Sequence, residues 1–297
     1  MHAFFEGLTG PDRPLRVLVV TGGHRYDEAA FGAMMDELGD EHHWVWATAR
    51  QPCAQRWFNP TLAGAWDVIL CHDVAGLHLE RGEEPVAVGP TSQQAAAIVG
   101  MLDAGQPLVV LHHAVASWPA WEGWAEAIGA RFHYGPGVLR GRPRRGSGYR
   151  YGTFPLVIAD KEHPIAKGLG DFELEDELYH FDVLTDVVHP VAFWATDFSG
   201  ELFTYTYDEV CQGIPSGATC EPDGIGPDLA AWTTTAGASP IAVLTPGDGP
   251  AAFVHPGFRQ LLTNSILWAA SGRARSHARS HRRRIDPSVN PPVQAPA

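Results

Sequence analysis

The chain has 297 residues, 45% of them hydrophobic, which is enough for a sizeable core in one large domain or at most two. Its formal net charge of −13 argues against a nucleic-acid partner, because surfaces that bind nucleic acid are basic. The first residues lack the basic and apolar regions of a signal peptide, and no run reaches the roughly 18 apolar residues of a membrane helix, so we expect a cytoplasmic protein with no membrane partner.

Short apolar runs and amphipathic segments alternate along the first half of the chain. The expected strands are residues 15–21, 42–47, 66–72 and 107–111. The expected helices are residues 26–38, 91–102 and 118–128. The run at 107–111 is the most apolar and is bounded by turn residues, which is typical of a strand buried on both faces. This alternation predicts a parallel sheet covered by helices.

The second half of the chain is richer in strand signals. Residues 149–160 are expected to form a strand or a hairpin. The strands expected after them are residues 191–196, 201–205, 241–244 and 251–254, and the last two are expected to form a hairpin across a Pro-Gly-Asp-Gly turn. A helix is expected over residues 258–271, ended by Gly272. We divide the chain into an N-terminal extension (1–14), a single domain (15–272) and a disordered tail (273–297) with six arginines and a Pro-rich end.

Several predicted strands end in polar residues, most of them histidines. These residues are His24, His72, Asp73, His112, His113 and His255. In open α/β sheets, ligands bind beyond the carboxyl ends of the parallel strands, so residues that follow neighbouring strands meet at one edge. An isolated histidine pair is more often satisfied by backbone hydrogen bonds, but the repeated pattern favours a site.

Two chemistries fit histidines grouped with a carboxylate. Neutral imidazoles and a carboxylate bind a divalent metal such as Zn²⁺ and leave one position for water or substrate. Alternatively, histidine and glutamate act as general base and general acid. The sequence contains neither His-Glu-x-x-His nor His-x-His, so spacing does not decide between the two.

Cys71 ends the third predicted strand beside His72 and Asp73. A thiolate close to histidines would be a nucleophile. A small buried core residue is the favoured interpretation, because free cysteine is among the most buried residue types. None of the four cysteines forms a C-x-x-C pair, which excludes a zinc ribbon and a thioredoxin motif.

Five stretches of the chain resemble the ThuA-like (trehalose utilisation) domain, a branch of the class I glutamine amidotransferase-like superfold. They are VLVVTGGHRYD, DVILCHD, LVVLHHAVASWPAWEGWAEAIGARFHYG, HPIAKGL with DFELEDELYHFDV, and AAFVHPGF, in family order between residues 15 and 272. The resemblance implies a flavodoxin-like, mostly parallel sheet with helices on both faces and additional β-hairpins in the C-terminal half. The position of the amidotransferase nucleophile holds His112 and His113 here, so glutamine amidotransferase activity is not expected.

The strand ends and the resemblance together predict the site: His72 and Asp73 follow from the strand ends alone, and the resemblance implies His24, His112, His113, His133, Glu177, Tyr179 and His255. The expected catalytic residues are His113, His112 and Glu177, the expected substrate-binding residues are His24, His72, Asp73, His133 and Tyr179, and the expected metal ligands are His24, His113 and His255. The chain departs from the family at two places. The closing turn, basic in the family, is Gly247, Asp248, Gly249 and Pro250 here, and residues 211–228 have no obvious family counterpart.

Members of this family are associated with sugars oxidised to 3-keto forms, so the resemblance implies a function in carbohydrate metabolism. We expect an enzyme that acts on a small-molecule sugar or 3-keto-sugar by His/Glu acid–base chemistry, with metal assistance left open. The alternative is a non-catalytic sugar-binding or assembly module on the same fold, because a fold alone does not establish chemistry. A homo-oligomer is compatible with the sequence.

Overall fold

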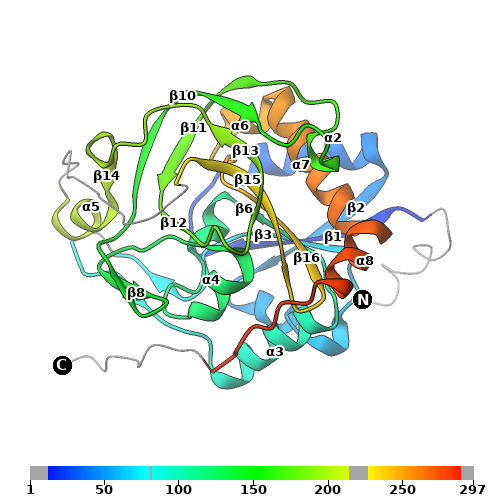
Figure 1. Cartoon of the computed structure of the whole chain (residues 1–297), viewed down its shortest axis with the longest axis horizontal. Coiled ribbons are helices and arrows are strands. Elements are labelled where there is room, and N and C mark those ends of the chain that lie inside the picture. Colours follow the sequence, from blue (N-terminus) through cyan, green and yellow to red (C-terminus); the bar gives the residue numbers. More distant parts are fainter. Residues whose placement is uncertain (1–12, 81, 214–226, 289–297) are drawn as a thin grey trace.

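A ten-stranded sheet runs through the protein, and the computed structural model describes residues 13–80, 82–213 and 227–288 (Figure 1). Its parallel half contains, in spatial order, β2 (Trp44–Arg50), β1 (Leu15–Gly22), β3 (Val68–Asp73), β6 (Leu108–Leu111) and β16 (Ser239–Leu244). Its antiparallel half continues through β15 (Leu229–Ala236), β13 (His189–Trp194), β10 (Gly148–Ile158) and β11 (Phe172–His180), and β14 (Thr204–Tyr205) pairs with β10. The parallel half has the strand order of flavodoxin-like folds, which confirms the predicted fold class.

Shorter elements complete the described part of the chain. The remaining strand pairs are β4 (Leu77–His78) with β5 (Val86–Ala87), β7 (Ala130–Arg131) with β12 (Asp182–Val183), and β8 (Gly137–Leu139) with β9 (Arg142–Arg144). The α-helices are α2 (Glu28–His42), α3 (Ser92–Asp103), α4 (Glu122–Ile128), α5 (Thr206–Gln212), α6 (Pro250–Val254), α7 (Pro256–Ala270) and α8 (Gly272–Ser280). The 3₁₀ helices are η1 (Cys53–Trp57), η2 (Pro60–Leu62), η3 (His112–Ala116), η4 (Pro164–Ala166) and η5 (Gly200–Leu202).

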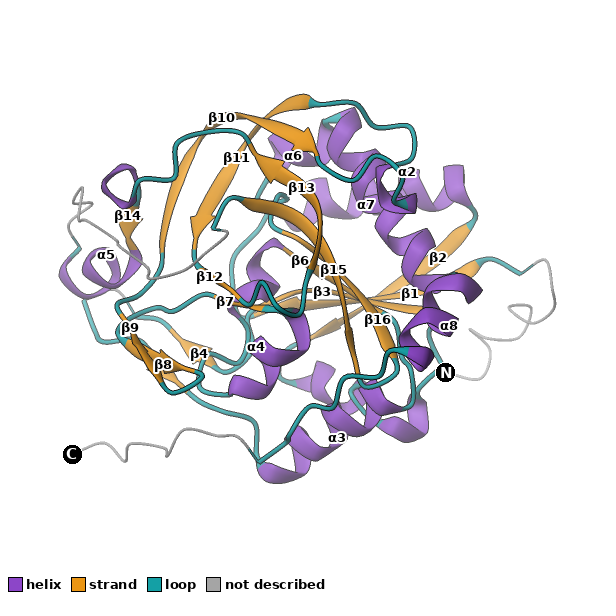
Figure 2. Cartoon of the chain, in the orientation of Figure 1, coloured by secondary structure: helices purple, strands orange, loops and turns teal. Residues whose placement is uncertain are grey.

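Helices cover both faces of the parallel half, as predicted (Figure 2). Alternate residues of β1 face opposite cores because successive side chains of a strand point to opposite sides. Leu18 and Val20 pack in the core that contains α3 and α4, whereas Val17 and Val19 pack in the core that contains α2, α6 and α7. The central strands are therefore fully buried, and only their ends can present polar groups to a ligand. Within the described residues, no helix is long and apolar enough to cross a membrane.

The tail predicted to be disordered is ordered over residues 273–288, so that prediction is wrong for this part. Ser271 caps α8, and the guanidinium group of Arg283 donates to the carbonyl of Ala127 and the hydroxyl of Thr234, each at 3.2 Å. Ile285 is 2% exposed. The high arginine content suggested a solvated segment. Arg275 and Arg283 instead bond to the domain, and Ala274, Ala278 and Ile285 pack against it, while the other four arginines are exposed. Residues 289–297 lie outside the described residues, as do 1–12 of the extension and 214–226 of the insertion.

Several predicted boundaries also differ from the structure. Residues 250–254 form α6 and not a strand, and β16 pairs with β15 on its antiparallel side, so the predicted late hairpin is wrong. Pro250 suits the first turn of a helix, where the missing N–H group has no helical partner to lose. The helix expected at 118–128 begins only at Glu122, and α2 extends to His42, where His43 ends it with a φ of +58°.

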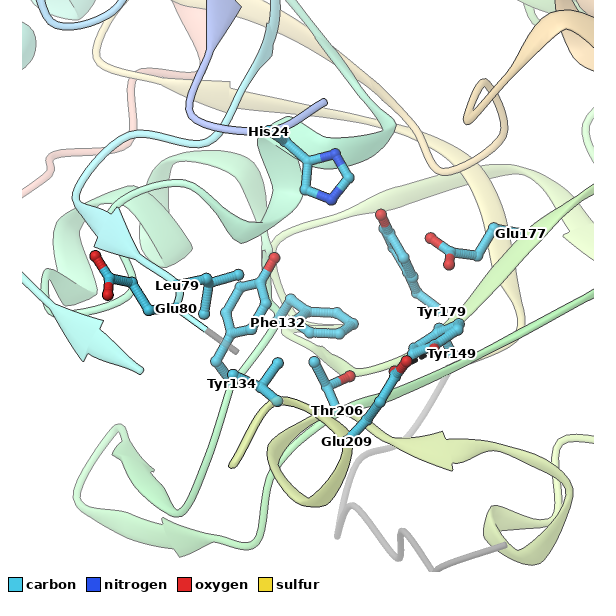
Figure 3. Close-up of a pocket in the computed structure, with 11 residues that line it drawn as sticks. His24, Leu79, Glu80, Phe132, Tyr134, Tyr149, Glu177, Tyr179, Thr206 and Glu209 are labelled. Carbon is cyan, nitrogen blue, oxygen red and sulfur yellow. Dashed lines mark hydrogen bonds between the residues drawn. The ribbon is translucent and has the colours of Figure 1, made fainter. Parts of the chain in front are cut away.

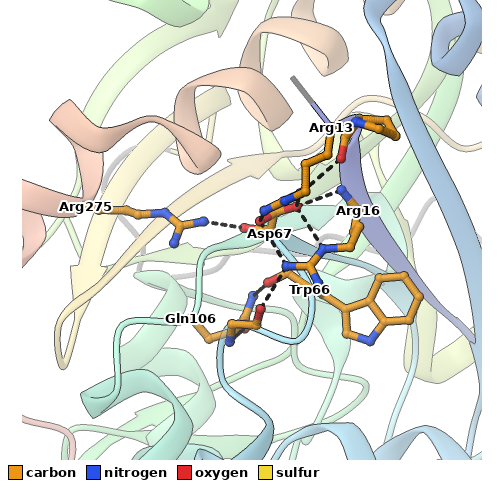
Figure 4. A network of polar contacts seen from close by, with 8 residues as sticks. Arg13, Arg16, Trp66, Asp67, Gln106 and Arg275 are labelled. Carbon is orange, nitrogen blue, oxygen red and sulfur yellow. Dashed lines mark hydrogen bonds and ion pairs between the residues drawn. The ribbon is translucent and has the colours of Figure 1, made fainter. Parts of the chain in front are cut away.

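A buried ionic network lies at the beginning of β1 and β3 (Figure 4). The carboxylate of Asp67 accepts hydrogen bonds from the guanidinium of Arg13 at 2.5 and 2.6 Å and from the backbone N–H of Arg16 at 2.9 Å. Arg275 of α8 donates to the carbonyl oxygen of Asp67 at 3.0 Å. Burial alone would raise the pKa of Asp67, but the hydrogen bonds from both arginines outweigh it and lower the pKa to about 2.

We expect Asp67→Asn to lower the free energy of unfolding at pH 7 by roughly 1–3 kcal/mol, because it leaves two arginines without their charged partner. The folded-state pKa of Asp67 is below its unfolded value of 3.8, so its contribution is present above about pH 4 and is lost as the pH falls through about 2. Urea unfolding at several pH values measures the difference between variant and wild type. Asp40→Asn, an exposed aspartate of α2, is the matched control. A difference that stays constant down to pH 2 would contradict the assignment.

Candidate functional site

The turn after β6 places two adjacent imidazoles at the edge of the sheet. The backbone of His112, the first residue of η3, has a φ of +41°, which residues other than glycine rarely adopt. His112 is 0% exposed and His113 is 2% exposed. Strained backbone of this kind persists where the surroundings hold it, and it is frequent at active sites.

The ring of His112 is held from both halves of the sheet. Its Nδ1 lies 2.6 Å from the carbonyl oxygen of Thr245, the residue after β16. Its Nε2 lies 2.7 Å from the hydroxyl oxygen of Tyr179 and 3.3 Å from Oε2 of Glu177, both on β11. A carbonyl can only accept, so Nδ1 must carry a proton. The structure thus brings the predicted residues His112, Glu177 and Tyr179 together.

Carboxylates surround His112 and set its charge. Burial alone would lower the pKa of His112, but hydrogen bonds with Asp248 and Glu177 and the nearby charge of Asp176 outweigh burial and raise the pKa to about 10. The same contacts hold the pKa of Asp248 well below its usual range, although burial opposes this. A protonated His112 therefore neutralises part of the negative charge at this end of the sheet.

Two acids of this site were not predicted from the sequence. Asp248 lies in the turn after β16, with Oδ1 3.5 Å from Nε2 of His112 and 3.3 Å from Nε2 of His113. The carboxylate of Asp176, 1% exposed, accepts hydrogen bonds from the backbone N–H groups of Gly247 at 2.6 Å and Asp248 at 3.0 Å. Burial raises the pKa of Asp176 to about 6. The sequence did contain a signal for Asp248. The turn at residues 247–250 is basic in the family, and here it places an aspartate where the strand ends were expected to converge.

His24 and His113 lie against each other. Their ring centroids are 3.9 Å apart with the planes 29° from parallel, and the ring of His72 is 5.2 Å from that of His113. The turn that carries His24 needs glycine, because a Cβ on Gly23 would lie 1.8 Å from the carbonyl oxygen of Val74. The predicted convergence of residues at the carboxyl ends of β1, β3 and β6 is therefore present in the structure.

His72 and Asp73, predicted to bind substrate, are buried beside the two imidazoles and do not line the pocket described next. They are 1% and 3% exposed. The ring of His72 stacks on Phe31 at 4.9 Å, and burial lowers its pKa to about 3, which keeps it neutral. Asp73 accepts a hydrogen bond from Nε2 of Gln51 at 2.8 Å, and burial raises its pKa to about 7.

A pocket of about 410 Å³ opens beside these residues (Figure 3). It is lined by His24, Leu79, Glu80, Phe132, Tyr134, Tyr149, Glu177, Tyr179, Thr206, Glu209 and Val210. In Figure 3 the ring of His24, from the turn after β1, and the carboxylate of Glu177, from β11, approach the pocket from different elements. Aromatic faces and carboxylates therefore alternate around one cavity, which fits a ligand that has both apolar faces and hydroxyl groups.

His133, predicted to bind substrate, and His255, predicted to bind a metal, do not line this pocket. Nε2 of His133 lies 3.3 Å from Oδ2 of Asp182, and His133 does not line the pocket although both of its neighbours do. Nδ1 of His255 accepts the N–H of Gly257 and caps α7, while its ring stacks on Phe172 at 5.1 Å. Its expected position at a strand end depended on the hairpin that does not form.

Among the described residues, His112, His113 and Asp248 each offer one ligand atom, and these atoms lie within 4.8 Å of one another, so the group could hold a metal ion. This set shares only His113 with the predicted ligands. His24 stacks on the face of His113, and its Nδ1 lies 2.7 Å from the carbonyl oxygen of Arg25.

The comparisons with known proteins agree with this architecture. The sequence model of the family described as ThuA, trehalose utilisation, matches residues 16–269. The chain belongs to the ThuA family. The description of the family supports a role connected with carbohydrate. No curated protein matches the chain.

Solved structures share the fold of this ThuA-family chain. A putative ThuA-like protein from Parabacteroides merdae is 16% identical, with a TM-score of 0.60, over 88% of this chain and 91% of its own. A putative ThuA-like protein from Bacteroides uniformis is 14% identical, with a TM-score of 0.59, over 89% of this chain and 95% of its own. A glutamine amidotransferase from Thermotoga maritima is 10% identical over 87% of this chain and 98% of its own, with a TM-score of 0.44, which is too low to support an argument.

We expect iodoacetamide to modify the exposed Cys53 but not Cys71 in the native protein. Cys71 is 0% exposed, and burial, reinforced by the charge of Asp73, raises its pKa well above the usual value, so modification requires local opening and should be at least roughly a hundredfold slower. Peptide mass spectrometry measures both sites in one sample. The urea-unfolded protein is the control, in which both should react. Rapid native labelling of Cys71 would instead support a thiol nucleophile.

Proposed function

We propose that this chain is an enzyme that acts on a neutral sugar or 3-keto-sugar bound in the pocket between His24, Glu177 and Tyr179. The observation that carries the proposal is the position of Glu177. Its side chain is 20% exposed and lines the pocket, and its Oε2 lies 3.3 Å from the buried Nε2 of His112. A carboxylate that faces a cavity and also contacts an imidazole is suited to move a proton to or from a ligand.

The walls of the pocket support a sugar as the ligand. Phe132, Tyr134 and Tyr149 offer aromatic faces for the apolar side of a pyranose ring, and Glu80 and Glu209 offer acceptors for its hydroxyl groups. The described lining residues include no lysine or arginine, while three of them are glutamates. This balance disfavours a phosphorylated or carboxylated sugar, because its charge would face carboxylates without compensation.

A 3-keto-sugar offers a chemical step that these groups can perform. The carbonyl acidifies the C–H bond next to it, and Glu177 as general base takes that proton while the electron pair of the bond forms the C=C bond of an enolate. The negative charge that develops on the carbonyl oxygen needs a donor, and the hydroxyl of Tyr179, which lines the pocket 2.7 Å from Nε2 of His112, can supply one. The neighbouring carbon carries a hydroxyl group, so the intermediate is an enediolate. If the proton of that hydroxyl moves to the former carbonyl oxygen and the first proton returns to the former carbonyl carbon, the carbonyl has shifted by one position and the isomerisation is complete without any further reactant.

A non-catalytic sugar-binding module is the second candidate. Its support is the fold-level analogy itself, because a pocket with aromatic walls binds sugars whether or not a proton is moved. This candidate predicts that the wild-type protein binds a 3-keto-glucoside and releases it unchanged.

We expect Glu177→Gln to reduce the turnover of 3-keto-glucosides by about 10²- to 10⁴-fold, because the amide cannot accept the proton, while the dissociation constant changes by only a few-fold. Product formation by NMR and binding by calorimetry separate the two effects. Glu173→Gln, an exposed glutamate of the same strand, should match the wild type. Undiminished turnover in Glu177→Gln would remove this residue from the mechanism. Binding without turnover in the wild type would favour the sugar-binding module.

A further inference from the structure

We propose that His112, His113 and Asp248 bind one divalent transition-metal ion, such as Zn²⁺, next to the pocket wall formed by Glu177 and Tyr179. The metal site stands on the geometry of these three side chains alone. Only the role of the ion in turnover rests on the function proposed above.

The spacing of the ligand atoms fits a single ion. The relevant atoms of the three side chains lie within 4.8 Å of one another, and Oδ1 of Asp248 is 3.5 Å from Nε2 of His112 and 3.3 Å from Nε2 of His113. Metal–ligand bonds of about 2.0–2.2 Å at tetrahedral angles separate neighbouring ligand atoms by about 3.3–3.6 Å. An ion can therefore enter this group with little movement of the carboxylate relative to the two rings.

His112 is oriented as a metal ligand usually is. Its Nδ1 lies 2.6 Å from the carbonyl oxygen of Thr245 and must carry a proton to make that bond. Metal-ligating histidines commonly donate one ring N–H to a carbonyl or carboxylate, which leaves the lone pair of the other nitrogen for the metal. Nε2 is the nitrogen that points to Asp248 and Glu177.

His113 supplies an independent observation. It is 2% exposed, and neither of its ring nitrogens has a hydrogen-bond partner among the described residues. Its Nε2 is 3.3 Å from Oδ1 of Asp248, yet the two atoms are not aligned for a hydrogen bond. Burying a polar nitrogen without a partner is costly, and coordination of a shared ion would remove that cost.

The third ligand is held by a second carboxylate. Asp176 accepts the backbone N–H groups of Gly247 and Asp248, and this fixes the turn that presents the Asp248 side chain to the histidines. Support of a ligand by an outer hydrogen bond is typical of built metal sites.

Two histidines and one carboxylate leave coordination positions open, which is typical of catalytic rather than structural ions. Glu177 and Tyr179 lie next to Nε2 of His112, and both line the pocket. An ion there would polarise the carbonyl oxygen of a bound keto-sugar and stabilise the enolate charge. Glu177 would then remain free to act as the base.

The test is metal binding by protein purified without a histidine tag and dialysed against a chelator. His277 and His281 stack at 4.1 Å on the surface and could bind zinc weakly, so every protein carries His277→Gln. Titration with ZnCl₂ or MnCl₂ by calorimetry, and metal analysis after gel filtration, should give about one ion per chain and a raised melting temperature.

Asp248→Asn and His113→Gln should each weaken binding at least about tenfold, because each removes a ligand. Asp248→Asn keeps the shape of the side chain, so it still reports if His113→Gln fails to fold. His255→Gln and His133→Gln are matched controls from outside the group and should bind like the parent protein. Weak binding in the parent protein, or loss of binding in His255→Gln equal to that in Asp248→Asn, would overturn the proposal.

Calorimetry with the sugar alone, on the same metal-free samples, keeps the two proposals apart. Failure of the metal titration with intact sugar binding rejects the ion and leaves the pocket function standing. Stoichiometric metal binding in a protein that neither binds nor converts a keto-sugar rejects the function and leaves the metal site standing.

Discussion

The ring of His112 joins the two halves of the sheet at the site, because its Nδ1 contacts the carbonyl oxygen of Thr245 and its Nε2 contacts the hydroxyl of Tyr179 on β11. β6 and β16 are parallel neighbours, and β16 also pairs with β15, the first strand of the antiparallel half. The histidines arrive from the parallel half, while Glu177 and Tyr179 arrive on β11 at the far edge of the antiparallel half. Only the twist and curvature of the whole sheet bring β11 over the end of β6, so the site depends on tertiary structure more than on any local motif.

Electrostatics explain why these groups occur together. Asp176, Asp248 and Glu177 would repel one another in a site of low solvent exposure, and the neighbouring imidazole relieves this repulsion. The backbone N–H groups of the 247–248 turn contribute further positive potential to Asp176. A basic turn at this position, as in the family pattern, would place a positive charge beside His112 and His113. This chain places the carboxylate of Asp248 there instead.

The sequence was informative where the signal is local. Apolar runs predicted β1, β3 and β6, because strands buried on both faces contain little else, and the residues after them met at one edge as expected. Prediction from the sequence failed where the same local pattern fits two structures. Pro-Gly-Asp-Gly is compatible with a hairpin turn and with the start of a helix, and this ambiguity misplaced His255 and hid Asp248. It also could not tell that His133 faces Asp182 while the residues on either side of it face the pocket.

The position of β16 has a consequence for biosynthesis. The interior strand β6 pairs with β3 on one side and with residues 239–244 on the other. Until residues 239–244 leave the ribosome, one side of β6 has no strand to pair with. An unpaired apolar strand resembles an exposed sheet edge, which is prone to pair with other chains. Nascent chains of this protein should therefore depend on chaperone protection until more than four-fifths of the polypeptide has been made.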